Sequence, residues 1–157
     1  MKKTFKTALV IVLVAISSWV SAQYNLIGKW VEKEGKDSSF FLFHNDGYIS
    51  MSVVEDNMQM DGHGFELEGF NACAKYTIKK VGKRLHFNMY IILVDLDSTV
   101  AMVAPGIIEF IDANTIKIAV NFENEAEGDL PETKLDAIRP KDFNNPDETV
   151  IMVRVKN

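Results

Sequence analysis

The stretch Leu26–Trp30, L-I-G-K-W, decides the expected fold, and Val31-Glu32-Lys33 continues it. Leu26, Gly28 and Trp30 fall on one face of an extended chain and the residues between them on the other, which is the period of a β-strand. A glycine between two large apolar residues on one face marks a tight bend or a close approach of backbone. We therefore expect a first strand whose apolar face points into the interior of a β domain.

Residues 1–22 have the pattern of a secretory signal peptide. A lysine-rich start is followed by the uninterrupted apolar run Ala8–Ile16 and by the small residues Val20-Ser21-Ala22. The apolar run holds nine residues, too few to span a bilayer, and no cysteine stands at the cleavage point to carry a lipid anchor. We predict cleavage after Ala22, a secreted or periplasmic location, and a mature form with no stable membrane anchor.

Gln23–Asn157 is long enough for one domain with a sizeable core. The whole chain has a net charge of −5; the signal peptide holds three lysines and no acid, so the mature domain carries −8. This acidic balance argues against nucleic acid and anionic membranes as partners. Cys73, the single cysteine, excludes an internal disulfide, and its place between Ala72 and Ala74 indicates a buried small hydrophobe.

Short alternating segments separated by turns occupy the rest of the chain. The expected strands after the first are Phe40–His44, Tyr48–Val54, Ala74–Val81, Arg84–Val94, Thr99–Ile111, Thr115–Phe122 and Thr149–Lys156. The turn His44-Asn45-Asp46-Gly47 favours a hairpin, and Pro105-Gly106 predicts a bulge or break. About eight strands at a spacing of roughly ten residues, with no crossover helix, predict an all-β, antiparallel up-and-down β-barrel.

Two long segments are less regular. Glu55–Gly69 is acidic and rich in glycine, and we expect a loop or a weak, distorted strand pair. Glu123–Glu148 is polar and rich in Pro, Asp and Asn, so it cannot be strand throughout and has room for one helical turn.

The chain resembles the small secreted bacterial lipocalin-like domains of the calycin group, whose first strand carries Gly-x-Trp as Gly28 and Trp30 do here. Its second half is most similar to a family of uncharacterised domains first catalogued in planctomycetes, through Gly106-Ile107-Ile108-Glu109, Arg139-Pro140-Lys141-Asp142-Phe143 and Arg154. The resemblance implies a lipocalin-like barrel in which Trp30 plugs one end and a basic residue covers its ring. Arg154 is the first candidate for that residue and Arg139 the second.

Candidates for chemistry are few. Three histidines, His44, His63 and His86, stand in no Gly-x-Ser-x-Gly, His-Glu-x-x-His or P-loop motif. We therefore predict no catalytic residue, no enzyme activity and no cofactor. Asp61, His63, Glu66 and Glu68 could offer metal ligands, but their spacing fits no standard metal-binding loop, and we predict no metal site.

Aromatic and Met residues at inward positions leave two functions open. Tyr76, Phe87, Met89 and Phe122 are the candidate ligand-binding residues of a barrel that holds a small apolar molecule. The same residues are equally consistent with a filled core. The domain would then be a structural or protein-interaction module that acts through its two long loops, with a partner that the sequence does not identify.

Overall fold

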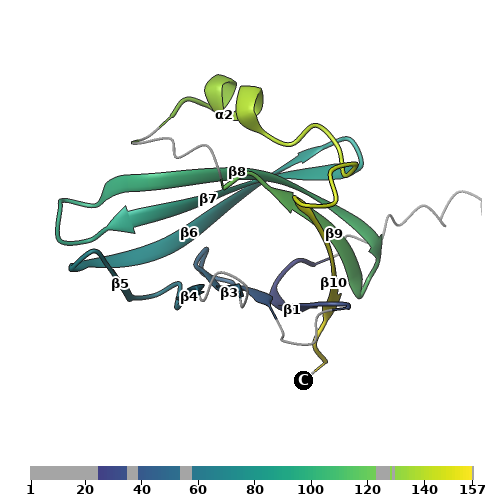
Figure 1. The fold of residues 1–157 in the computed structure, drawn as a ribbon, viewed down its shortest axis with the longest axis horizontal. Helices are drawn as coiled ribbons and strands as arrows, with labels where there is room; N and C mark the ends of the chain where they lie inside the picture. The colour runs from purple at the N-terminus through teal and green to yellow at the C-terminus, as the bar shows by residue number, and fades with distance from the viewer. Residues whose placement is uncertain (1–24, 35–38, 54–57, 123–127, 129, 157) are drawn as a thin grey trace, which may run out of the picture.

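The structure is a computed structural model that describes residues 25–34, 39–53, 58–122, 128 and 130–156 (Figure 1). The predicted signal peptide and its cleavage point lie outside these residues. Within them, no helix combines the length and the apolar character needed to cross a membrane.

The described chain is all-β with one short helix, as the alternation predicts. The elements are β1 (Gly28–Glu32), β2 (Phe40–Phe43), β3 (Ile49–Val53), β4 (Met58–Met60), β5 (Phe65–Leu67), β6 (Phe70–Val81), β7 (Arg84–Leu93), β8 (Thr99–Asp112), β9 (Thr115–Val120), α2 (Glu132–Ile138) and β10 (Thr149–Arg154). Ten strands replace the expected eight or so because the irregular segment 55–69 contributes β4 and β5, of three residues each. The helix α2 is longer than the single turn expected.

All ten strands form one antiparallel sheet in the order β4-β3-β2-β1-β10-β9-β8-β7-β6-β5. β1 pairs with β10, so the two ends of the domain are joined, and the remaining opening lies between β4 and β5. β4 and β5 therefore do not pair with each other, although they are adjacent along the chain.

Three backbone contacts bridge this opening. Tyr48 forms a β-bridge with Lys75, the Tyr76 N–H donates to Gly47 O at 2.9 Å, and the Ala74 N–H donates to Gly62 O at 2.9 Å. We call this zone, formed by residues 44–50, 61–63 and 74–76, the seam. It makes the sheet a nearly closed barrel, the architecture of a lipocalin-like fold.

The predicted bulge or break at Pro105-Gly106 is wrong, because β8 continues through these residues without a register shift there. Pro105 lies opposite the end of β9, and its carbonyl still accepts from the Asn121 N–H at 3.0 Å. The absence of an N–H on Pro105 therefore removes little hydrogen bonding from the sheet. A Cβ at Gly106 would lie 2.6 Å from Ala119 O, so this glycine permits close strand packing. The register instead shifts between Ile91 and Ile92 and between Phe110 and Asp112.

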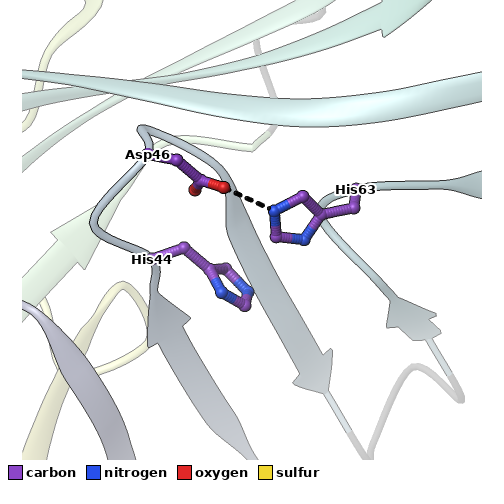
Figure 2. A group of neighbouring side chains, drawn as sticks. All are labelled: His44, Asp46 and His63. Atoms are coloured by element: carbon purple, nitrogen blue, oxygen red, sulfur yellow. Dashed lines mark hydrogen bonds and ion pairs between the residues drawn. The ribbon is translucent and has the colours of Figure 1, made fainter.

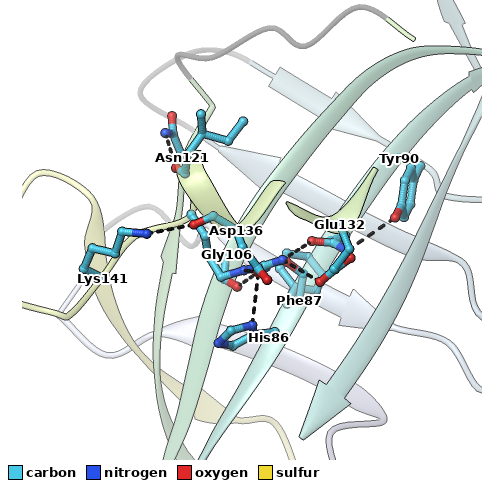
Figure 3. Close-up of polar contacts among 11 residues, drawn as sticks. His86, Phe87, Tyr90, Gly106, Asn121, Glu132, Asp136 and Lys141 are labelled. Atoms are coloured by element: carbon cyan, nitrogen blue, oxygen red, sulfur yellow. Dashed lines mark hydrogen bonds and ion pairs between the residues drawn. The ribbon is translucent and has the colours of Figure 1, made fainter. Parts of the chain in front are cut away.

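The helix α2 lies on the outer side of the barrel over β7 and β8 (Figure 1) and is anchored by Arg139. The Arg139 side chain is 3% exposed. Its five N–H groups all have acceptors: Phe87 O, Gly106 O, Asn88 Oδ1, Glu132 Oε1 and Asp136 Oδ1, at 2.8–3.1 Å (Figure 3). Arg139 thus joins both ends of α2 to two strands.

The remainder of the Arg-Pro-Lys-Asp-Phe motif continues this attachment. Arg84 on β7 donates from Nη1 to Lys141 O at 2.8 Å and lies 5.2 Å from the Phe143 ring centroid. The motif therefore straps the segment after α2 across the outside of the barrel. The structure assigns Arg139 to this anchor and not to the Trp30 ring.

The Arg139 anchor is expected to make the stability of the domain depend on pH. The hydrogen bond from Arg139, with the nearby charges of Arg139, His86 and Lys79, holds the pKa of Asp136 below its ordinary value of 3.8. A lowered folded-state pKa stabilises the fold above the unfolded value, and this contribution is lost as pH falls below about 4 toward the folded pKa. We expect the melting temperature to drop over this window. Asp136→Asn should reduce the drop, and an identical pH profile would contradict this.

Candidate functional site

Trp30 closes one end of the barrel. Its side chain is fully buried, its indole N–H donates to Leu26 O at 2.8 Å, and its ring meets Phe110 edge-on at 6.0 Å. The Arg154 guanidinium lies 4.3 Å from the Trp30 ring centroid, and Arg154 is the direct cross-strand partner of Trp30 in the β1–β10 pair.

Gly28 leaves space beside the Arg154 guanidinium. Gly28 has φ of +121°, and a Cβ there would lie 3.2 Å from Arg154 Nη1. Arg154 also donates to Ile27 O at 2.6 Å and to Asn25 O, and so holds the entering chain over the barrel end. Gly28, Trp30 and Arg154 therefore form one structural unit that seals this end.

The other end of the barrel contains a cavity of about 700 Å³. This volume is within the range of roughly 300–1,000 Å³ typical of small-molecule sites. Five of the chain's seven methionines line it: Met58, Met60, Met89, Met102 and Met152. The other apolar lining residues are Phe41, Val53, Ile118, Val120, Phe122, Pro146 and Val150.

The four predicted ligand-binding residues divide into two pairs. Met89 and Phe122 line the cavity. Phe87 and Tyr76 are not among the lining residues and instead pack edge-on against Phe43, with ring centroids 5.8 and 5.2 Å away. Phe87 is fully buried there, and the Tyr76 hydroxyl donates to His44 O at 2.8 Å. The structure thus gives Phe87 and Tyr76 a packing role and leaves Met89 and Phe122 at the candidate site.

The charged residues at the cavity are all acidic, beside the neutral polar residues Ser39, Ser52, Asn121 and Thr149. Glu32, Asp147 and Glu148 line it, and no lysine or arginine is among the described lining residues. Thr149, also in the lining, has a buried hydroxyl with no hydrogen-bond partner in the described part of the chain. A buried polar group without a partner is rare in folded proteins. The cavity therefore combines apolar walls with acidic residues and with no basic residue among its described lining.

A second cluster lies at the seam, where His44, Asp46 and His63 come together from two turns (Figure 2). His63 Nε2 is 2.8 Å from Asp46 Oδ2. The hydrogen bond with His63 is the main cause that lowers the pKa of Asp46. Of the four residues considered as metal ligands from the sequence, only His63 belongs to this group; Glu66 and Glu68 lie outside it.

A third cluster joins α2, which carries Glu132 and Asp136, to β7, which carries His86 (Figure 3). Glu132 and Asp136 are the carboxylates that accept from Arg139. Because the Arg139 guanidinium already donates hydrogen bonds to both carboxylates, this cluster is part of the α2 anchor and is not free to bind a metal ion.

No protein-family model and no curated protein sequence matches the chain. Among solved structures, the fold is similar to the crystal structure of pallilysin from Treponema pallidum. That match has 13% sequence identity and a TM-score of 0.48, and it covers 99% of each chain.

Proposed function

We propose that this domain is an exported member of the lipocalin-like group. It binds a small apolar molecule in the Met-lined cavity and does no catalysis there. The supporting observation is the cavity itself, about 700 Å³ in volume and walled by five methionines. Methionine side chains are unbranched and polarisable, so they repack around ligands of irregular shape. Such a wall suits an adaptable binding pocket for a flexible apolar chain.

The polar residues of the cavity indicate which head group the ligand carries. Glu32, Asp147 and Glu148 repel an anionic head group and attract a cationic one. A neutral head group meets no such repulsion. We therefore propose an apolar molecule with a neutral or cationic head group, in preference to a free fatty acid.

A series of twelve-carbon ligands that differ only in the head group tests this proposal. Dodecyltrimethylammonium, titrated below its micelle concentration, and dodecanol, titrated below its solubility limit, should bind about tenfold more tightly than dodecanoate, a difference of about 1.4 kcal/mol. Isothermal calorimetry measures each affinity. Tightest binding of dodecanoate would contradict the head-group assignment, and no binding of any of the three would contradict the carrier function.

A pair of matched variants tests the location. Met102 and Leu67 are both partly buried and pack against the interior cluster, but only Met102 lines the cavity. Met102→Gln puts an amide into the apolar wall, at a cost of about 1–3 kcal/mol, and should weaken dodecanol binding roughly tenfold or more. Leu67→Gln should leave the affinity unchanged. Equal effects of both variants would argue against this site.

The export part of the proposal predicts a mature N-terminus at Gln23. It rests on the lysine-rich start, the apolar run and the small residues before the cleavage point. N-terminal sequencing of protein from the envelope or medium tests it, and an exported protein that retains Met1–Ala22 would contradict it.

A further inference from the structure

We propose that His44, Asp46 and His63 bind a divalent transition-metal ion, for which Zn²⁺ is the probe, and that this ion locks the seam of the barrel. The proposal is independent of the ligand cavity.

The donor set fits such an ion. Two imidazoles and one carboxylate are ligands that zinc and related divalent metals take, often with water in the remaining positions. One ligand atom from each residue lies within 4.8 Å of the others. Ligand atoms around one zinc ion lie about 3–3.5 Å apart, so small side-chain rotations bring the three into place. The side chains of His63 and Asp46 are 47% and 48% exposed, which leaves the ion a path from water and room for bound water.

The residues around the three ligands hold them in orientation. Ser50 Oγ lies 2.9 Å from His44 Nε2 and also accepts from the Gly62 N–H at 2.9 Å. Asp61 Oδ1 accepts from the His63 backbone N–H at 3.1 Å and lies 3.8 Å from His63 Nδ1, too far for a hydrogen bond to the ring. Metal-binding histidines characteristically have a hydrogen-bond partner on the other ring nitrogen, as Ser50 provides for His44.

Aromatic packing further restricts His63. Its ring stacks on Tyr48 with centroids 4.5 Å apart and meets the His44 ring edge-on at 4.6 Å. Both imidazoles are therefore placed before any ion arrives, which lowers the entropy lost on binding.

The position of the cluster gives the ion a consequence for the fold. His44 and Asp46 belong to the turn between β2 and β3, whereas His63 belongs to the turn between β4 and β5. Both turns meet β6 at the seam through isolated backbone contacts and not through a strand-to-strand ladder: Gly47 O accepts from the Tyr76 N–H, and Gly62 O accepts from the Ala74 N–H. An ion shared by both turns would tie these two acceptors together and so stiffen the seam.

Calorimetric titration of the purified, untagged protein with Zn²⁺ tests the site. We expect saturation at one ion per chain. Asp46→Asn keeps the size and hydrogen-bonding capacity of the side chain but removes its charge, and should weaken binding at least about tenfold. His86→Ala, in the cluster occupied by Arg139, is the matched control and should change the affinity by less than about twofold. His63→Ala should abolish binding, and where it disturbs folding Asp46→Asn decides the test.

Hydrogen exchange of the amides places the ion at the seam. Zn²⁺ should slow exchange of the Ala74 and Tyr76 amides, whose N–H groups bond across the seam, in the unmodified protein but not in Asp46→Asn. Three results would overturn the proposal: no binding up to about 1 mM Zn²⁺, binding that Asp46→Asn leaves intact, or binding without protection of these two amides.

Discussion

Replacing Trp30 by alanine is expected to lower the free energy of unfolding by about 3–5 kcal/mol, the usual cost of removing a large aromatic residue from a core. Trp30 is fully buried, and its loss would leave a cavity at the sealed end of the barrel. It would also remove the hydrogen bond to Leu26 O and the surface on which Arg154 lies. Urea denaturation followed by circular dichroism measures the change.

Arg154→Gln separates the contribution of the Arg154 cation from the cost of the space that Trp30→Ala leaves. It removes the cation–π contact and the hydrogen bonds to the entering chain but leaves the Trp30 ring in place. The expected loss is about 1–2 kcal/mol, less than that of Trp30→Ala. An unchanged denaturation midpoint for Trp30→Ala would refute the sealing role of this residue.

Arg139→Met is expected to cost about 3 kcal/mol, because breaking a buried charged network strands its acceptors. Phe87 O, Gly106 O and Asn88 Oδ1 would each lose a charged donor, and α2 would lose its anchor. The estimate is at the low end of the range since Glu132 and Asp136 are 41% and 46% exposed and can turn to water. Urea denaturation again provides the measurement.

Lys141→Met is the matched control for Arg139. Lys141 also donates to the helix, to Asp136 O at 2.8 Å, but from an exposed position. Exposed charged contacts contribute little, so the expected loss is under about 1 kcal/mol. Equal losses for the two variants would show that α2 is not held by the buried guanidinium.

The sequence predicts the strands wherever apolar and polar residues alternate over enough positions to show a period of two. The strand expected at Arg84–Val94 is β7, with Phe87, Met89 and Ile91 turned inward. The hairpin expected at His44–Gly47 joins β2 to β3, with Gly47 at φ of +86°. By contrast, β4 and β5 have three residues each, which carry no usable period. Each forms only by pairing with the strand next to it along the chain, β3 or β6.

The candidate cavity was only partly accessible to sequence reasoning. Its methionines come from four strands, two from β4 and one each from β7, β8 and β10, and only the sheet order brings them together. In the sequence, only the methionines at inward positions point to the cavity, and Met89 is the one among the four predicted ligand-binding residues. Phe87 shares that face, but its place along β7 puts it against Phe43 and outside the cavity.

The seam cluster and the two arginines depend on the same long-range information. His44 and His63 stand in turns at the same end of the β2-β3-β4 meander, and they are brought together by the pairing of β3 with β4, a strand too short to show a period. Arg154 and not Arg139 covers Trp30 because the β1–β10 register places Arg154 directly opposite it. Neither the register between strands nor the closure of the barrel can be read from the local pattern of residues.

Ligand binding in the Met-lined cavity is tested most directly by NMR of protein labelled at the methionine methyl groups. Met58, Met60, Met89, Met102 and Met152 line the cavity, whereas Met51 is buried in the same core but outside the lining. Addition of dodecanol should shift the methyl signals of the five lining residues and leave that of Met51 in place. Unchanged signals up to the solubility limit, or shifts in which Met51 moves as much as the others, would contradict the account.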